Sequence, residues 1–249
     1  MISVAWLAVA LPVMMTALGL GVVVGYHRVL THRAARLHPL VEKALVLVAL
    51  GAGTPVQWVG NHRFHHAHAD TPADPHSPHH RGFWVAHCGW YLGTRSTALS
   101  VVYAFAGPLR TLFDALWRPR TNLEHAHLAK DIAADPFYAW ISRPLPYALV
   151  LLGTAGAVWC AFVALWGAAG VAAMIFLHLV AYTFGDGVNS LGHTGGSAKD
   201  DALLAVLTFG DGWHRGHHDN PRAIRAGSVD VAYLFVRALE RAGLASELH

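Results

Sequence analysis

The sequence predicts an all-α fold, an integral membrane helical domain with a helical cap on its cytosolic side. Three observations lead to this prediction. Of the 249 residues, 54% are hydrophobic and only 13% are charged, about half the charged fraction of a typical soluble domain. Two long stretches contain no charged residue at all. Histidine is the unusual count, because 19 imidazoles outnumber the 18 Lys and Arg residues.

The two uncharged stretches predict three membrane crossings. Residues 1–26 are long enough to cross the hydrocarbon layer. A basic leader and a small-residue cleavage pattern are both missing there, so we interpret the stretch as a retained helix rather than a signal peptide. Residues 144–185 are long enough for two crossings with a break at 167–170. The expected crossings are at about 3–26, 145–165 and 168–187.

The positive charges predict the orientation. All Lys and Arg residues lie at or after position 28, and none lies between 144 and 198. The positive-inside rule then places residues 28–143 and 186–249 on the cytoplasmic side. The apolar segment 44–59 is short, is interrupted by Pro55, and has basic residues on both flanks, so we expect a re-entrant or interfacial helix. A single domain, 1–249, with about three crossings plus this helix follows.

Several function classes find no support in the sequence. The net charge of +3 and the absence of a basic run with interleaved aromatics give no indication of nucleic-acid binding. No nucleophile elbow, phosphate-binding loop or dinucleotide fingerprint is present. The uncharged stretches also lack the carboxylates that ion-coupled transporters place within the membrane.

Two histidine triplets share the spacing H-x-x-H-H. They are His62, His65 and His66 in "NHRFHH" and His214, His217 and His218 in "WHRGHH". On a helix, positions i, i+3 and i+4 lie on one face. Imidazole nitrogen suits Fe, Cu, Zn or Ni, and six such donors exceed what one tetrahedral ion needs. The spacing therefore favours a two-metal site held by the cap.

Two further groups lie next to apolar segments on the same side. His27 and His32 are five residues apart, which rotates an α-helix by about 140°, so only a helix end or bend would let them converge. Asn189 and His193 are four apart, so an amide or its bound water could join a histidine at one metal. We expect all four groups to form one metal centre.

One histidine-rich stretch is interpreted differently. His76, His79 and His80 lie in "DPHSPHHRG", a proline-rich segment without helical spacing. We expect a surface loop there, with no more than adventitious metal binding.

The ordered groups resemble the membrane fatty acid desaturase family, especially its acyl-CoA Δ9 (stearoyl-CoA desaturase-like) branch. The three histidine boxes of that family, H-x-x-x-x-H, H-x-x-H-H and H-x-x-H-H, match in order, and "VNSLGH" resembles its N-S-x-x-H element. The resemblance runs from about residue 5 to about residue 225. It implies a di-iron centre that uses O₂ and two electrons to remove two hydrogens from a fatty acyl chain. The implied metal ligands are His27, His32, His62, His65, His66, His193, His214, His217 and His218, with Asn189 acting through water.

The chain departs from the family pattern in three respects. The usual four crossings become three, so we expect a truncated start or a short form lacking the first membrane helix. Gly60-Asn61 replaces an Arg-Asp pair implicated in binding the thioester head group, so acyl-CoA, acyl-carrier and lipid-bound chains all stay open. The T-W pair often found before N-S-x-x-H is replaced by "TFGDG", so a different arrangement of the fourth ligand element stays open. Apart from these departures, no cytochrome domain is fused, so electrons would come from a ferredoxin, a rubredoxin or a b-type cytochrome with its reductase.

The remaining expectations concern the substrate and the alternatives. Trp58, with Gly60 and Asn61, is a candidate for the substrate tunnel or head-group site. The bilayer would be the plasma or inner membrane if the source is bacterial. A membrane di-iron acyl or alkyl hydroxylase has the same spacing, because the same chemistry can deliver a hydroxyl. A non-catalytic metal-binding membrane protein is the alternative from another class.

Overall fold

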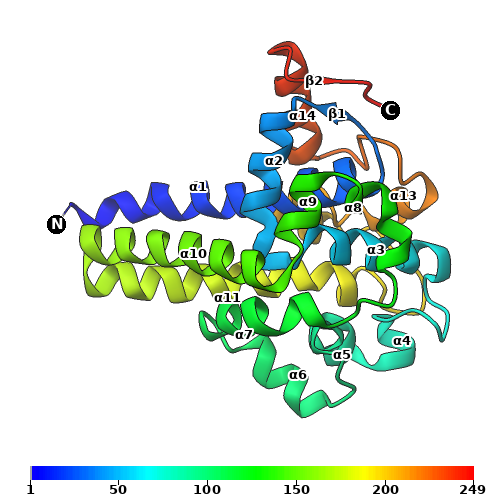
Figure 1. The fold of residues 1–249 in the computed structure, drawn as a ribbon, viewed down its shortest axis with the longest axis horizontal. Helices are drawn as coiled ribbons and strands as arrows, with labels where there is room; N and C mark the ends of the chain where they lie inside the picture. Colours follow the sequence, from blue (N-terminus) through cyan, green and yellow to red (C-terminus); the bar gives the residue numbers. More distant parts are fainter. Residues whose placement is uncertain (1) are drawn as a thin grey trace.

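The computed structural model describes residues 2–249, and almost all of its regular structure is helical (Figure 1). The only strands in this range, β1 (Arg36–Leu37) and β2 (Ala245–Ser246), form one short antiparallel pair. The predicted all-α class is therefore confirmed. The α-helices are α1 (Leu7–Leu20), α2 (Pro39–Val48), α3 (Pro55–His68), α4 (Pro78–Arg81), α5 (Phe83–His87), α6 (Thr97–Ala104), α7 (Leu109–Trp117), α8 (Lys130–Ala133), α9 (Pro136–Ile141), α10 (Pro144–Trp166), α11 (Ala168–Leu191), α12 (Ala202–Leu207), α13 (His214–Asp219) and α14 (Val231–Arg241).

Shorter helical segments connect these elements. A π-helix, η2 (Gly21–Thr31), continues α1 without a break. The 3₁₀ helices are η1 (Val4–Trp6), η3 (Ala49–Ala52), η4 (Gly89–Leu92), η5 (Arg118–Arg120) and η6 (Ala126–Ala129).

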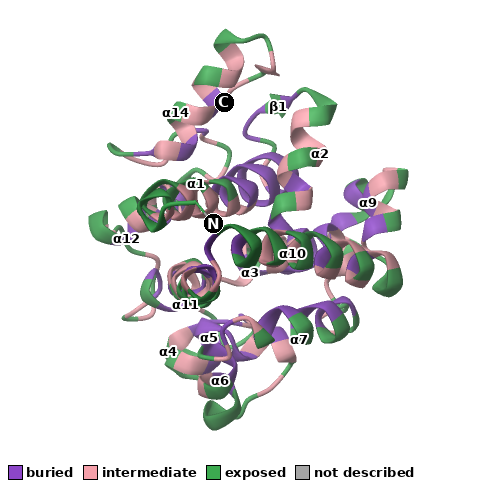
Figure 2. Cartoon of the chain, turned by 90° about the vertical axis from the view of Figure 1, so that its left-hand side faces the viewer, coloured by how far each residue is buried: buried purple, intermediate pink, exposed green. Residues whose placement is uncertain are grey.

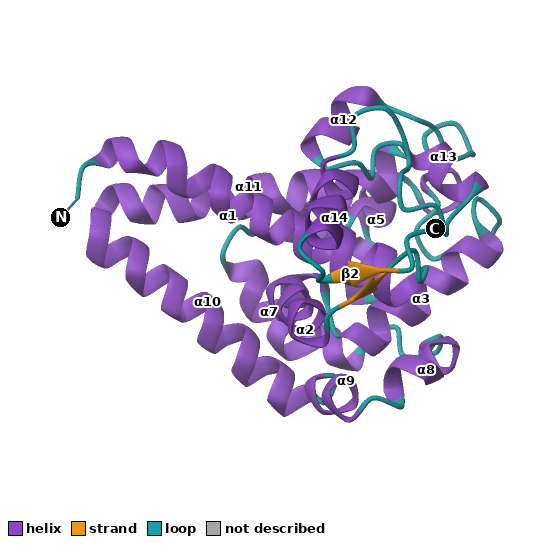
Figure 3. Cartoon of the chain, turned by 90° about the horizontal axis from the view of Figure 1, so that it is seen from above, coloured by secondary structure: helices purple, strands orange, loops and turns teal. Residues whose placement is uncertain are grey.

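Three helical segments are long and apolar enough to cross a membrane: Val4–Thr31, Pro144–Trp166 and Ala168–Leu191. They run side by side and project away from the remaining helices, with the N-terminus at the far end (Figures 1 and 3). Their outer surfaces are largely exposed (Figure 2) and carry apolar side chains such as Leu145 and Leu149. Exposed apolar surface on this scale suits a lipid environment.

The interrupted segment near residue 53 forms a bent helix pair. Pro39–Ala52 and Pro55–His68 meet at 75°, as a broken span or a re-entrant loop would. At the bend, Gly53 has φ of +118°, which side chains rarely adopt. Thr54 caps α3 through Gln57 N, and Pro55 occupies the first turn. Because of this bend, α3 and its histidine triplet lie next to the end of η2.

The remaining helices form a cap at one end of the three apolar segments. There η2, α3, the end of α11 and α13 surround a common volume (Figure 1). The strand pair lies beside α14 (Figure 3), and the buried face of α14, with Ala232 and Val236, packs on Val24 and Val29 of η2. The C-terminal segment thereby supports the helix that carries the first pair of histidines.

Candidate metal centre

The structure brings all nine sequence-predicted histidines into two adjacent groups. Nitrogen atoms of the first group lie within 4.8 Å of one another, and the same holds for the second. The first group combines η2, α3 and α13, and comprises His27, His32, His62, His66 and His217. The second combines α3, the turn that follows α11, and α13, and comprises His65, His193, His214 and His218.

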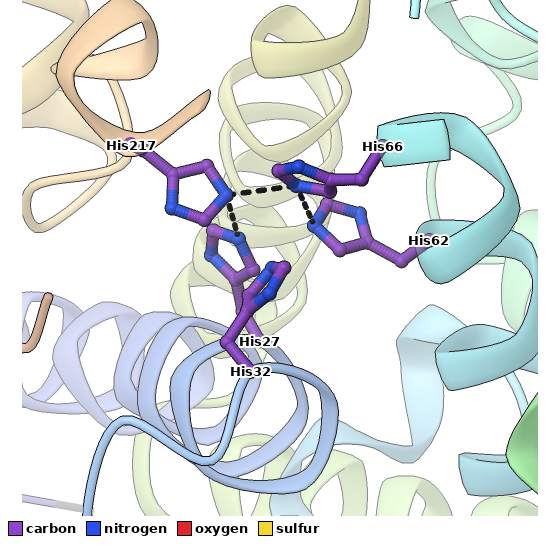
Figure 4. Close-up of side chains that lie close together, drawn as sticks. All are labelled: His27, His32, His62, His66 and His217. Carbon is purple, nitrogen blue, oxygen red and sulfur yellow. Dashed lines mark hydrogen bonds between the residues drawn. The ribbon is translucent and has the colours of Figure 1, made fainter. Parts of the chain in front are cut away.

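In the first group, the Nε2 atoms of His27, His62, His66 and His217 face one another (Figure 4). His217 Nε2 lies 2.9 Å from Nε2 of both His27 and His66. His66 Nε2 in turn lies 3.1 Å from His62 Nε2. The fifth member, His32, has a buried Nε2 with no hydrogen-bond partner among residues 2–249.

The second group repeats this arrangement. His214 Nε2 lies 2.8 Å from His193 Nε2 and 3.2 Å from His218 Nε2. His218 Nε2 lies 3.3 Å from His65 Nε2. His65 and His193 are almost fully buried.

These separations fit imidazoles arranged around metal ions. Two nitrogens bound at about 2.1 Å with bond angles near 90–110° are about 3.0–3.4 Å apart. A neutral imidazole has only one N–H, so a ring of facing nitrogens leaves lone pairs pointing at lone pairs. A cation at the centre of each group removes that repulsion. The donor set therefore fits a metal at each group.

Three carboxylates fix which nitrogen faces each centre. His27 Nδ1 donates to Asp211 at 3.0 Å, His65 Nδ1 donates to Asp74 at 3.0 Å, and His193 Nδ1 donates to Asp70 at 2.8 Å. A proton held at Nδ1 leaves the Nε2 lone pair free for a metal and raises its basicity. Sequence reasoning missed these aspartates. Their signal was their position beside the boxes, in "HADTPADPH" and "GDGWH".

Seven of the nine imidazoles have a lowered pKa, which holds them in the neutral form that metals require. Burial, reinforced by neighbouring imidazoles, lowers the pKa of His66 to about 3 and of His218 to about 2. The same causes lower the pKa of His62, His65 and His214 well below the ordinary value. A cluster of uncharged donors at neutral pH is what a metal-free histidine site should present.

The π-helix explains how His27 and His32 meet. In η2 the backbone hydrogen bonds join residue i to residue i+5, and His32 N donates to His27 O at 3.2 Å. Residues i and i+5 therefore lie one above the other, whereas in an α-helix they would diverge. The two ring centroids are 5.0 Å apart. The bend that the sequence requires here is thus a widened helical turn.

The expectation for His76 is wrong. His76 is buried, and its ring centroid lies 4.1 Å from that of His65. It forms a third potential ligand group with His65 and Asp74. Asp74 accepts hydrogen bonds from His65 Nδ1 and from the backbone of Asp70 and His76, and so folds this segment against α3. His79 and His80 are exposed.

The other predicted site residues lie around the centre. Asn189 lines a cavity that reaches the histidine groups, and it donates to the Tyr91 hydroxyl at 3.0 Å. Trp58 lines the same cavity and stacks on His62, with ring centroids 4.7 Å apart.

Gly60 and Asn61 instead face the segment that precedes η6. A Cβ on Gly60 would lie 2.4 Å from His125 O, so only glycine permits this approach. The Asn61 amide donates to Gln57 O and Asn122 O. In the structure both positions make packing contacts.

An apolar cavity of about 400 Å³ connects the spans to the metal centre. Met14, Leu18 and Trp159 line its wall between the spans, whereas His62 and His214 line it at the centre. A chain of methylene groups suits such a wall, because apolar burial is favourable without directional contacts.

Comparison with known proteins identifies the family. The family model described as "Fatty acid desaturase" matches residues 4–229. The sn-1 stearoyl-lipid 9-desaturase of Anabaena variabilis is 32% identical over 92% of this chain and 79% of its own length. Delta-9 acyl-lipid desaturase 2 of Arabidopsis thaliana is 31% identical, over 92% and 70% respectively. Acyl-CoA C20 Delta5-desaturase of Anemone leveillei is 30% identical, over 92% and 69%. The chain therefore belongs to the fatty acid desaturase family, and it is a membrane oxidoreductase that acts on fatty acyl chains.

Proposed function

We propose that this protein is an O₂-dependent di-iron desaturase that introduces a double bond into a fatty acyl chain. The observation that best supports the proposal is the convergence of nine imidazoles at the end of an apolar cavity. The cavity offers room for an alkyl chain, and the imidazoles offer ligands suited to iron.

In this proposal each group of histidines holds one iron. His27, His32, His62, His66 and His217 would hold the first. His65, His193, His214 and His218 would hold the second, with Asn189 acting through a water molecule. The two irons, when bound, supply the O₂ chemistry that removes hydrogen from an unactivated C–H bond, which no amino-acid side chain can do.

The residues of the chain would orient the substrate and exclude water. The apolar wall between the spans excludes water from the alkyl chain. Asp70, Asp74 and Asp211 hold the imidazoles in one orientation. Trp58, stacked on His62, would form part of the wall around the acyl chain near the metal centre.

The orientation, the electron donor and the carrier belong to the same proposal. The absence of positive charge between 144 and 198 supports a cytoplasmic cap, in the plasma or inner membrane if the source is bacterial. Electrons would come from a separate ferredoxin, rubredoxin or b-type cytochrome with its reductase. The relatives carry both acyl-lipid and acyl-CoA names, so the choice of carrier needs a test of its own.

Lipid profiling tests the proposal. The chain is expressed with candidate redox partners in a host lacking desaturases, and fatty acids are compared between wild type, His65→Ala and His79→Ala. We expect new unsaturated chains with wild type and with His79→Ala, because His79 is exposed. His65→Ala should produce none. Unsaturation that survives His65→Ala would contradict the assigned site.

The same samples separate the alternatives. Hydroxylated chains in place of unsaturated ones would identify a hydroxylase. Purified protein that contains zinc or copper but no iron, and that consumes no O₂ with a reductant, would identify a non-catalytic metal-binding protein.

A further inference from the structure

Helix α7 has its polar face inside and its apolar face outside. Arg110 and Asp114 are almost fully buried, as is Arg118 directly after the helix. The opposite face exposes Leu109, Leu112, Phe113, Leu116 and Trp117. A helix at a water surface has the reverse arrangement. Because α7 packs along the span α10, its outer face continues the apolar surface of the spans, where the surroundings are lipid.

The inner face of α7 forms a buried cluster that we call the guanidinium cluster. Its charged members are Arg110, Arg118, Asp114 and Asp186, and its aromatic members are Tyr91, Tyr103 and Tyr182. Arg110 Nη1 donates to Asp186 Oδ2 at 2.5 Å. The Tyr103 and Tyr182 hydroxyls both donate to Asp114. The guanidinium carbons of Arg110 and Arg118 each lie 3.9 Å from a tyrosine ring centroid, of Tyr182 and Tyr91 respectively.

Arg118 has donors without acceptors. It is 4% exposed, and no carboxylate in residues 2–249 lies within 4.0 Å of it. Its one side-chain hydrogen bond runs from Nη1 to Gly51 O at 3.4 Å, and its Nε has no partner in the described chain. Arg110 Nε likewise has none. A guanidinium carries five N–H donors, and leaving them buried without acceptors is unfavourable.

Both arginines line the same cavity as the metal centre. Tyr91 connects the two regions, because its ring supports Arg118 and its hydroxyl accepts from Asn189. The two arginine side chains therefore contribute polar groups to the wall of a mainly apolar cavity, whose lining also includes His62 and His214.

The charge of the cluster indicates which acceptor fits. Two guanidinium groups face two carboxyl groups, so the formal charges already balance. A free carboxylate would add an unbalanced negative charge, whereas a neutral carbonyl oxygen accepts hydrogen bonds without one.

We propose that Arg118, assisted by Arg110, binds the carbonyl oxygen of the acyl ester of a membrane lipid. The inference rests on the proposed function only in taking an acyl chain as the ligand of the cavity. The lipid-facing outer side of α7 favours a membrane lipid as the source of the ester. An anchored carbonyl would also fix which carbon atoms reach the metal centre.

Binding without turnover tests this site. Metal-loaded protein in nanodiscs, without reductant, is titrated with monostearoylglycerol, stearoyl-CoA, stearate and octadecane by displacement of a fluorescent fatty acyl probe. Arg118→Met should weaken monostearoylglycerol binding on the order of 10- to 100-fold. Octadecane, which has no oxygen, should bind equally to both proteins. Arg120→Met is the matched control, because Arg120 is exposed two residues away, and it should change neither affinity.

Each other outcome overturns the proposal. Equal losses for octadecane and the ester would mean that Arg118 only supports packing. A loss confined to stearate would identify a carboxylate site, and one confined to stearoyl-CoA would exclude a membrane lipid. An unchanged affinity for the ester would remove the site altogether.

Two measurements keep the test decisive. If Arg118→Met fails to fold, Arg118→Lys, which keeps the charge but loses the planar fork, should fold and bind the ester more weakly than wild type. Equal ester binding by a folded Arg118→Lys variant would contradict the fork contact. Desaturation is assayed separately. Product formation with no Arg118-dependent binding would defeat this inference alone, and Arg118-dependent binding with no product would defeat the proposed function alone.

Discussion

The histidine groups and the guanidinium cluster are both buried and polar, but their charges are balanced in different ways. The histidine groups contain lone pairs that face one another, with carboxylates only on their outer side. The guanidinium cluster contains both signs of charge, joined directly by Arg110 and Asp186. The first region is incomplete without a cation, whereas the second balances its own charge.

This difference predicts how each region responds to perturbation. The stability of the histidine groups should depend on metal and on pH, because metal ions and protons both bind to the imidazole nitrogens. The guanidinium cluster should depend on keeping its partners together. The following predictions test that contrast in order of expected size.

The largest effect should come from the metal. A ligand that binds only the folded state at a thousand times its dissociation constant adds about 4 kcal/mol, so two ions add about 8 kcal/mol. Calorimetry of the purified protein, before and after chelation and again after Fe²⁺ addition, measures this. The same metal-dependent increase in the free energy of unfolding should be observed in a variant of the guanidinium cluster. Equal melting temperatures with and without metal would contradict the contrast.

The pH dependence of the metal-free protein should come next. An unfolded imidazole titrates near 6.5, but burial holds the pKa of His66 at about 3 and of His218 at about 2. Below pH 6.5 the unfolded state therefore binds protons that the folded state rejects. The contribution of these imidazoles to the free energy of unfolding is therefore fully present above pH 6.5 and is lost progressively toward pH 3. Each such imidazole should lower the free energy of unfolding by about 1 kcal/mol between pH 7 and 5.5. Thermal melts across this range provide the check, and a flat profile would refute it.

Breaking the pair between Arg110 and Asp186 should cost about 3–5 kcal/mol, because the remaining charge is buried alone. Replacing both, as Arg110→Met with Asp186→Leu, should recover most of that loss. Thermal melts of the two single variants and the double variant form the cycle. Arg33→Met, at a half-exposed ion pair with Asp131, serves as the control and should cost under about 1 kcal/mol. A double variant as unstable as the sum of the singles would show that the pair is not coupled.

The smallest effect should follow from Asp74→Asn. The amide can no longer accept the His65 Nδ1 proton as a charged group, so metal affinity should fall about 10- to 100-fold. Competition with a chromophoric chelator measures that affinity. Asp219→Asn, at an exposed position beside the third box, should leave it unchanged. An unaltered affinity in Asp74→Asn would mean that the carboxylate does not orient the ligand.

Sequence spacing predicted much of the histidine centre because helical periodicity is a local property. His62, His65 and His66 share a face of one helix whatever surrounds them. The π-turn that joins His27 to His32 was predicted only as a bend, since α and π hydrogen bonding leave the same residues in place. His76 was missed because its burial depends on Asp74 drawing a proline-rich segment onto α3, which is a tertiary contact.

The guanidinium cluster could not be predicted from periodicity for a different reason. Arg110, Asp114 and Arg118 recur every four residues, a pattern that in water indicates an exposed face. The pattern fixes which residues share a face but not which medium that face meets. Only the position of α7 beside a span reverses the interpretation.

The continuity of α1 and η2 couples the first histidine group to the bilayer itself. His27 and His32 lie at the end of an uninterrupted helix that begins at Val4, whereas the other histidines of the group belong to α3 and α13. A spanning helix changes its tilt to match hydrocarbon thickness. Any such tilt moves two imidazoles relative to the other three, so lipid composition becomes a determinant of the geometry of this histidine group.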